Sequence, residues 1–221
     1  MSPLLAGVVL LLGAFAIYCD YFRTAWFPFT KGLPIVVLIL ALGRELFGLP
    51  AGAPPLPGEG VAWWIWIGLL LGLAGDLLLL KKEYFLFGLA AFLQGHLCYV
   101  AAFAGDYAWR VELLVPIALF GLGFGGLLCY FLIKNDRKSY LVPVALYIIV
   151  ICLMLVYALH SDLEQAGVVR AFGAGALLFA ASDALLALNR FARRFPEAQL
   201  MVLATYYSAQ LCIAAGAMSV I

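Results

Sequence analysis

Two aspartates are the residues of this sequence whose type and position most clearly indicate chemistry. Asp76 and Asp183 each lie inside an apolar run, in the stretches LAGDLLL and AASDALL, with no basic residue close by in the same run. An aspartate at the centre of a membrane-spanning helix costs about 2.5 to 3.5 kcal/mol on insertion scales, so a pair of them indicates a function. The structural alternative is that each carboxylate is hydrogen-bonded to a hydroxyl or an amide of another helix.

Small residues, Gly75 and Ser182, precede the two acids and leave space for a ligand beside each carboxylate. Two carboxylates in one poorly hydrated cavity cannot both ionise cheaply, so one should hold a proton while the other stays anionic. A general acid beside a general base suits a hydrolysis in which the substrate is protonated and a water is activated, each contributing about 10² to 10⁴ in rate. Either aspartate could take either role.

Four polar residues in the apolar runs could line the same cavity: His96, Tyr206, Tyr207 and Gln210. The two tyrosines lie about 15 Å in from Pro196 at helical rise, which is too deep for an interfacial aromatic belt. Their hydroxyls should therefore have polar partners. A single histidine on a helix is more often a hydrogen-bonded core residue.

Lys31 lies shortly before Pro34, at the expected start of a helix. A phosphate group there would find both an ammonium and unpaired backbone amides. The alternative is that the lysine side chain snorkels to the membrane surface.

Motifs for several other chemistries are missing from the sequence. It has two histidines and five cysteines, and the cysteines are spread singly over apolar runs, which argues against a zinc site, a thiolate cluster or a disulfide framework. P-loop, GxSxG, HExxH and CxxC patterns are absent. The glycines at 121, 123, 125 and 126 have the spacing of a helix-packing stripe rather than a phosphate loop. We therefore expect no metal site.

The elements that must position these residues are membrane helices. Of 221 residues, 67% are hydrophobic and 11% are charged, with a mean hydropathy of +1.09, far from the composition of a soluble domain. The formal net charge of +1 leaves neither a basic surplus for nucleic acid nor an acidic tail. The composition therefore excludes a disordered chain and a nucleic-acid-binding protein.

Eight runs are apolar enough to cross a bilayer, given that a spanning helix needs about 20 such residues. The second run is the weakest, because only twelve residues separate Lys31 from Arg44. We predict an all-α integral membrane protein with one domain over residues 1–221 and eight transmembrane helices, at residues 4–18, 32–47, 61–80, 84–104, 111–133, 140–159, 166–189 and 197–220.

The distribution of basic residues predicts the orientation of these helices. Ten of the 13 Lys and Arg residues lie in odd-numbered connections, and only Arg44, Arg110 and Arg170 lie in even ones. Since cytoplasmic loops carry the excess of positive charge, the odd connections should be cytoplasmic and both termini extracytoplasmic. The proline-rich linker at residues 49–60 then becomes an external loop that cannot be helical.

An internal duplication relates the two halves of the chain. A shift of about 110 residues aligns Pro34 with Pro143 and Asp76 with Asp183 and, after a seven-residue insertion, HLCYVAA from His96 with QLCIAAG from Gln210. We predict two parallel four-helix repeats, at about 1–105 and 111–221, related by an axis along the membrane normal. Both aspartates then lie at a similar depth, about 7 to 11 Å below the cytoplasmic boundary.

Six stretches together resemble the YhhN-like lysoplasmalogenase family of membrane proteins. They are KGLPIVVL from Lys31, LAGDLLL around Asp76, FGLAAFLQGHLCYV ending at Val100, LVPVALY from Leu141, ALLFAASDALLALNRF around Asp183 and TYYSAQLCI from Thr205. The resemblance covers six of the eight expected helices in the same order. The Ser-Asp and Tyr-Tyr-x-Ala-Gln elements are its most specific parts.

This resemblance implies hydrolysis of the vinyl-ether bond of 1-alkenyl lysophospholipids from the membrane. The products would be a fatty aldehyde and glycerophosphoethanolamine or glycerophosphocholine, and no metal or organic cofactor is required. One of Asp76 and Asp183 would donate a proton, while the other would activate water and stabilise the cation. Lys31, or less favourably Lys81 or Arg190, would hold the phosphate. The remaining substrate-binding residues would be His96, Ser182, Tyr206, Tyr207 and Gln210.

Other functions stay open at this level. Buried acids in repeated halves are also what a proton-coupled transporter needs. The stretch from Gly72 to Asp76 loosely resembles the glycine-rich aspartate motif of intramembrane aspartyl proteases, although Asp183 follows a serine where that class has a tyrosine. A helical protein without activity is the third alternative. As the location, the bacterial inner membrane is favoured over the endoplasmic reticulum.

Overall fold

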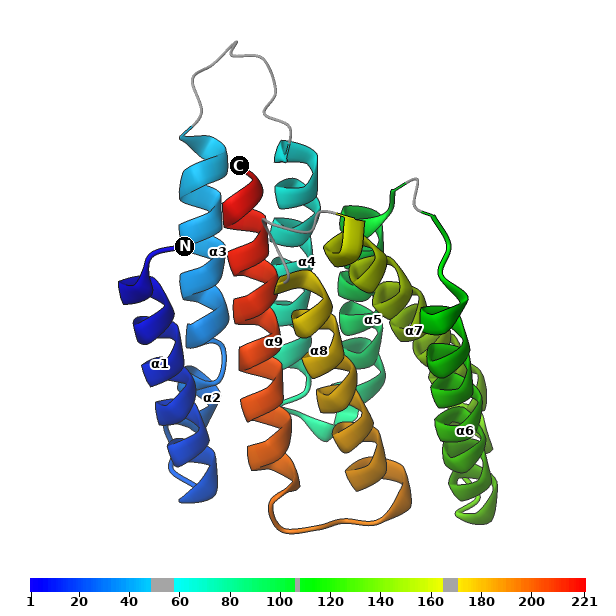
Figure 1. The fold of residues 1–221 in the computed structure, drawn as a ribbon. Coiled ribbons are helices and arrows are strands. Elements are labelled where there is room, and N and C mark those ends of the chain that lie inside the picture. The colour runs from blue at the N-terminus through cyan, green and yellow to red at the C-terminus, as the bar shows by residue number, and fades with distance from the viewer. Residues whose placement is uncertain (49–57, 106–107, 165–170) are drawn as a thin grey trace.

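The computed structural model describes residues 1–48, 58–105, 108–164 and 171–221, and this part of the chain is helical with no strand (Figure 1). Three short turns connect longer helices: η1 (Lys82–Tyr84), η2 (Lys138–Tyr140) and the π-helical η3 (Leu188–Ala192). The α-helices are α1 (Pro3–Tyr21), α2 (Phe27–Thr30), α3 (Leu33–Phe47), α4 (Glu59–Leu78), α5 (Phe85–Phe103), α6 (Val111–Lys134), α7 (Leu141–Glu164), α8 (Ala171–Ala187) and α9 (Ala198–Val220).

Eight helical segments in the described residues are long and apolar enough to span a membrane, which confirms the all-α, eight-helix prediction. The protein is therefore an integral, multi-pass membrane protein. Part of the predicted external linker, residues 49–57, lies outside the described residues, as do Arg170 and the first residues of the seventh run. Glu59 and Gly60, which we expected in that linker, already belong to α4.

The second span is longer than the sequence indicates. It runs from Phe27 to Phe47, because the short helix α2 precedes α3 with only two residues between them. Both helices carry a proline in their first turn, Pro28 and Pro34, where the missing N–H would be unpaired anyway. Lys31, expected at an open helix start, consequently lies inside this span and is buried.

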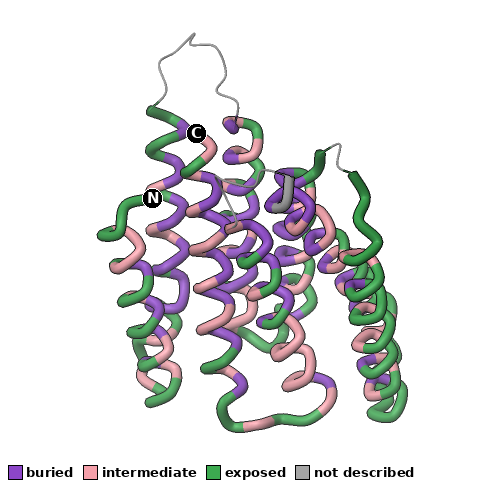
Figure 2. Tube along the Cα trace, in the orientation of Figure 1, coloured by how far each residue is buried: buried purple, intermediate pink, exposed green. Residues whose placement is uncertain are grey.

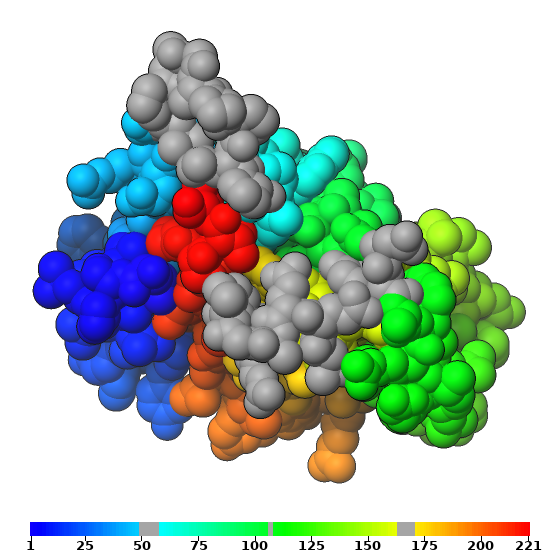
Figure 3. Space-filling model, turned by 45° about the horizontal axis from the view of Figure 1, so that its top comes forward, coloured from blue at the N-terminus to red at the C-terminus, as the bar shows by residue number. Residues whose placement is uncertain are grey.

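Helix α9 lies at the centre of the bundle. It packs against α8 most extensively, and also against α1, α3 and α4, while α4 packs mainly against α5 (Figure 1). Figure 3 shows the C-terminal end of α9 lying between α1 and the first part of α4. The helices that carry the two aspartates, α4 and α8, are thus each held by the helix that follows them in the chain.

The packing partly matches the predicted repeats. The pair α4 and α5 has its counterpart in α8 and α9, and the pair α3 and α4 in α7 and α8. The first helices of the halves differ, since α1 packs on α9 whereas α6 packs chiefly on α7. The division into two four-helix repeats stays a prediction.

Burial is concentrated on the inner helices (Figure 2). Helix α6 lies at one edge, and Ile117, Leu128 and Leu132 are its buried residues. Its outer face carries exposed leucines such as Leu119 and Leu122, as expected for a helix whose outer face contacts lipid. The polar side chains discussed next are enclosed by the inner helices.

Candidate active site

A polar chamber with a cavity volume of about 310 Å³ lies among α4, α5, α8 and α9, near the turns η1 and η3. Both predicted catalytic residues, Asp76 on α4 and Asp183 on α8, line it. Lys31, Ser182 and Tyr206 also line the chamber, and His96, Tyr207 and Gln210 reach its residues through polar contacts. The structure thus brings the eight site residues predicted from the sequence into one region.

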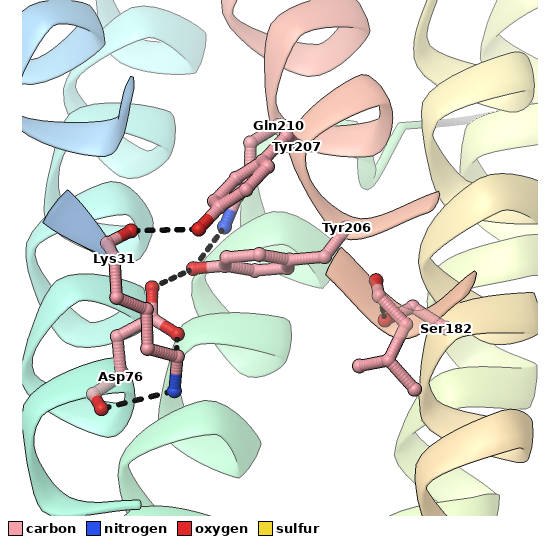
Figure 4. Close-up of polar contacts among 7 residues, drawn as sticks. Lys31, Asp76, Ser182, Tyr206, Tyr207 and Gln210 are labelled. Atoms are coloured by element: carbon pink, nitrogen blue, oxygen red, sulfur yellow. Dashed lines mark hydrogen bonds and ion pairs between the residues drawn. The ribbon is translucent and has the colours of Figure 1, made fainter. Parts of the chain in front are cut away.

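Asp76 is paired with a lysine that lies between α2 and α3. Its carboxylate Oδ1 lies 3.2 Å from Lys31 Nζ, and the same ammonium donates a hydrogen bond of 3.1 Å to the Asp76 carbonyl (Figure 4). The Tyr206 hydroxyl donates to Asp76 Oδ2 at 2.9 Å. Asp76 is 2% exposed and Lys31 6%. An ammonium and a hydroxyl around a buried carboxylate favour its anionic form.

A chain of hydrogen bonds holds Tyr206 in place. Gln210 Nε2 donates to the Tyr206 hydroxyl at 3.5 Å, and Gln210 Oε1 accepts a bond of 2.6 Å from the Tyr99 hydroxyl. Tyr206 and Gln210 are four residues apart and therefore lie on one face of α9. On the facing helix α4, a Cβ atom added at Gly72 would lie 3.0 Å from Gln210 Nε2 and 3.2 Å from the Tyr206 hydroxyl. Glycine at this position lets α9 bring both groups up to Asp76.

Tyr207 binds Lys31, the other member of this ion pair. Its hydroxyl donates to the Lys31 carbonyl oxygen at 2.9 Å (Figure 4). This bond fixes the backbone of the residue whose ammonium holds Asp76. The neighbouring tyrosines therefore bind the two members of one ion pair.

Asp183 has a different set of partners. Its Oδ2 accepts a hydrogen bond of 3.1 Å from the Tyr147 hydroxyl of α7 and lies 3.2 Å from His96 Nε2 of α5. The Asp183 side chain is 11% exposed, whereas that of His96 is 1% exposed. The two acids therefore share a chamber but differ in charge balance, since Asp76 faces a lysine and Asp183 a histidine.

The imidazole of His96 constrains where a proton can lie. Its Nδ1 is 2.7 Å from the carbonyl of Phe92, which can only accept, so Nδ1 carries hydrogen. Within the described part of the chain, Nε2 makes no well-aligned hydrogen bond, and its near neighbour is the Asp183 carboxyl group. A favourable contact needs one proton between them, held either by Nε2 or by Asp183.

Ser182, Lys31 and Lys81 make contacts within the protein rather than being free for the substrate contacts predicted from the sequence. The Ser182 hydroxyl donates to the Val202 carbonyl at 3.1 Å, so it joins α8 to α9 (Figure 4). The ammonium of Lys31 is engaged by Asp76 rather than exposed for a phosphate. Lys81 lies over the Tyr84 ring, and the cations that line the chamber besides Lys31 are Lys82, Arg190 and Arg194.

Sequence reasoning missed two tyrosines of the site, Tyr99 and Tyr147. Tyr99 follows His96 by three residues and so lies close to the same face of α5. Tyr147 lies about 10 Å in from Tyr140 at helical rise, so the depth argument applied to Tyr206 would have marked it. Among the described residues, no three His, Cys, Asp or Glu side chains lie close enough to hold a metal ion.

Comparison with known proteins places these residues in a family context. The model of the YhhN family matches residues 26–217 of the chain. The pig protein lysoplasmalogenase TMEM86B is 33% identical over 211 residues, 91% of this chain and 84% of that protein. Bovine lysoplasmalogenase TMEM86A is 32% identical over 211 residues, 90% of this chain and 84% of that protein. The lysoplasmalogenase of Mycobacterium bovis is 30% identical over 217 residues, 86% of this chain and 80% of that protein. No solved structure matches.

Proposed function

Because the chain belongs to the YhhN family, and relatives along most of its length are named lysoplasmalogenase, we propose that it is a lysoplasmalogenase. It would hydrolyse the vinyl-ether bond of 1-alkenyl lysophospholipids to a fatty aldehyde and a glycerophosphoethanolamine or glycerophosphocholine. The observation that carries the proposal is the chamber into which two acids of different environment project, Asp76 and Asp183.

The reaction requires an acid and a base but no change of oxidation state. A proton adds to the β-carbon of the vinyl ether, and the resulting oxocarbenium ion takes water at the carbon bonded to oxygen. That water loses a proton to give a hemiacetal, which collapses to the aldehyde and the free hydroxyl of the glycerol. One water is consumed, and the protons balance.

The two acids suit different steps of this reaction. The proton shared by Asp183 and His96 is the one available for transfer to carbon, because each partner can hold it in turn. Asp76, held anionic by Lys31 and Tyr206, would stabilise the oxocarbenium ion and accept the proton of the attacking water. In this scheme Lys31, Tyr206 and Gln210 position Asp76, and Tyr147 positions Asp183.

The location of the chamber suits a lipid substrate. Its lining cations, Lys82, Arg190 and Arg194, belong to connections that the positive-inside rule places in the cytoplasm. The chamber would then open at the inner leaflet, and both termini would be extracytoplasmic. The vinyl ether of a lysophospholipid lies just beneath its headgroup, at a depth similar to that of the acids.

Release of aldehyde by the purified protein tests the proposal. In lipid nanodiscs, 1-alkenyl lysophosphatidylethanolamine should yield aldehyde, whereas the 1-alkyl and 1-acyl analogues should not. Asp76→Asn and Asp183→Asn should each lower the rate by about 10²-fold or more. Asp136→Asn is the matched control, since Asp136 is exposed and has a positive φ of 54° that asparagine tolerates.

Three results of these experiments would contradict the assigned roles, the hydrolase function, or both in favour of a transporter. Aldehyde release that is unchanged in both site variants would refute the assigned roles. Absence of aldehyde with the wild-type protein would refute the function. Accumulation of unaltered lipid inside sealed vesicles would indicate a transporter instead.

A further inference from the structure

A second, narrow and apolar groove adjoins the polar chamber. It lies between α5, α6, α7 and α8, and apart from Tyr147, Asp183 and Arg190 its lining side chains are all apolar. The scheme proposed above uses Asp183 and Tyr147 but assigns no role to the apolar side chains of this groove.

The groove and the chamber share a wall. Phe85, Asp183, Leu186 and Arg190 line both, whereas Asp76 lines the chamber alone. The Arg190 guanidinium lies over the Phe85 ring, 4.4 Å from its centroid. A cation stacked in this way is held in place while its N–H groups remain in the plane of the guanidinium, where a phosphate can accept from them.

The two spaces differ in polarity in the way that the two parts of a lysolipid differ. Lys82, Arg190 and Arg194 gather on the chamber side, where an anionic headgroup would be attracted. The groove side offers Phe120 and Phe124 of α6 and Ile148 and Ile151 of α7. A lysolipid has one hydrocarbon chain and one charged headgroup, and the carboxyl group of Asp183 lies where the two spaces meet.

We propose that the hydrocarbon chain of the substrate occupies the groove between α5, α6, α7 and α8, with its phosphate in the chamber near Arg190. This inference rests on the proposed function and extends it. The vinyl ether, which joins the hydrocarbon chain to the headgroup, then lies where the two spaces adjoin, with its β-carbon at Asp183 and its ether oxygen on the chamber side with Asp76. The assignment makes Asp183 the residue that contacts the carbon to be protonated. It also makes the loosely packed helix α6 one wall of the path from the bilayer.

Photo-crosslinking locates the hydrocarbon chain of a bound lipid without depending on hydrolysis. The probe is a 1-alkyl lysophosphatidylethanolamine, which has no vinyl ether, with a diazirine a few carbons from the ether oxygen. We expect adducts on groove residues such as Phe120, Phe124 and Ile151. Adducts on α1, α2 or α9, or spread evenly over the lipid-facing surface, would overturn the inference.

Two matched variants test the groove further. Ala184 lines the groove but not the chamber, whereas Ala145 is exposed and lines neither, so Ala184→Phe should block the groove while Ala145→Phe should not. Ala184→Phe should lower crosslinking and the rate on a hexadecenyl substrate about 10-fold or more, with much less effect on a butenyl substrate. Equal loss on both substrates, or no loss with either, would contradict the inference.

The two proposals fail separately. Wild-type protein that releases no aldehyde but crosslinks in the groove would refute the hydrolase and retain the lipid-chain site. Aldehyde release together with adducts elsewhere would refute the chain site and retain the hydrolase.

Discussion

Nε2 of His96 lies 3.2 Å from Oδ2 of Asp183, so a histidine of the first half of the chain contacts an acid of the second half. The reverse relationship holds at the other acid, where Tyr206 of α9 donates to Asp76 of α4 at 2.9 Å. Each carboxylate is therefore held by a helix from the opposite half. Neither half alone contains a complete set of partners.

Replacement of His96 by glutamine should impair catalysis more than binding. The variant retains a polar side chain but cannot shuttle a proton, so we expect kcat to fall by about 10²-fold with little change in KM. The dependence of kcat on pH should also change, because glutamine cannot hold the shared proton. Gln94→Ala, on the exposed face of the same helix, is the control and should leave both constants unaltered. A wild-type pH profile in His96→Gln would argue against proton sharing.

Removal of the lysine of the buried ion pair should destabilise the protein. Lys31→Met leaves the Asp76 carboxylate without its ammonium, and breaking a buried pair in this way costs about 3 to 5 kcal/mol. The double variant Lys31→Met with Asp76→Asn should recover part of that loss, because no charge is left unpaired. Reversible unfolding in mixed detergent micelles measures the free energy of unfolding of both variants. Additive effects of the two substitutions would mean that the pair is not coupled.

A methyl group at Gly72 should disturb Tyr206 and Gln210. The added Cβ of Gly72→Ala would lie 3.0 Å from Gln210 Nε2, so the two side chains must move and the bond from Tyr206 to Asp76 should lengthen. We expect the rate of aldehyde release to fall about 10-fold, which corresponds to about 1.4 kcal/mol in the barrier. Gly60→Ala on the same helix meets nothing within 4 Å and should keep full activity. Equal activity of the two variants would show that this close approach is unimportant.

The two adjacent tyrosines should respond differently to loss of their hydroxyls. Tyr206→Phe removes a donor to the Asp76 carboxylate and should lower kcat, whereas Tyr207→Phe removes a bond to the Lys31 carbonyl and should mainly cost about 1 kcal/mol of stability. Aldehyde release and unfolding, measured on both variants, give the comparison. A larger loss of kcat in Tyr207→Phe would contradict the roles given to them.

The sequence alone determined the membrane helices and the acids. Apolar runs with charged ends define spanning segments, because the bilayer imposes one length and one solvent on every helix. The same solvent makes an aspartate inside such a run costly, so Asp76 and Asp183 are visible without coordinates. The depth of Tyr206 and Tyr207 in the last apolar run likewise indicated that their hydroxyls need polar partners.

The partners of these residues were decided by the tertiary structure. Lys31 looked like a phosphate ligand at an open helix start, yet the added turn of α2 places it inside the bundle against Asp76. The depth of Tyr147 indicates that it needs a polar partner, but that this partner is Asp183 follows only from the packing of α7 on α8. Hydropathy fixes how deep a residue lies, but it contains no information about which helix faces which. That choice depends on side-chain packing between segments far apart in the chain, and only the folded bundle contains it.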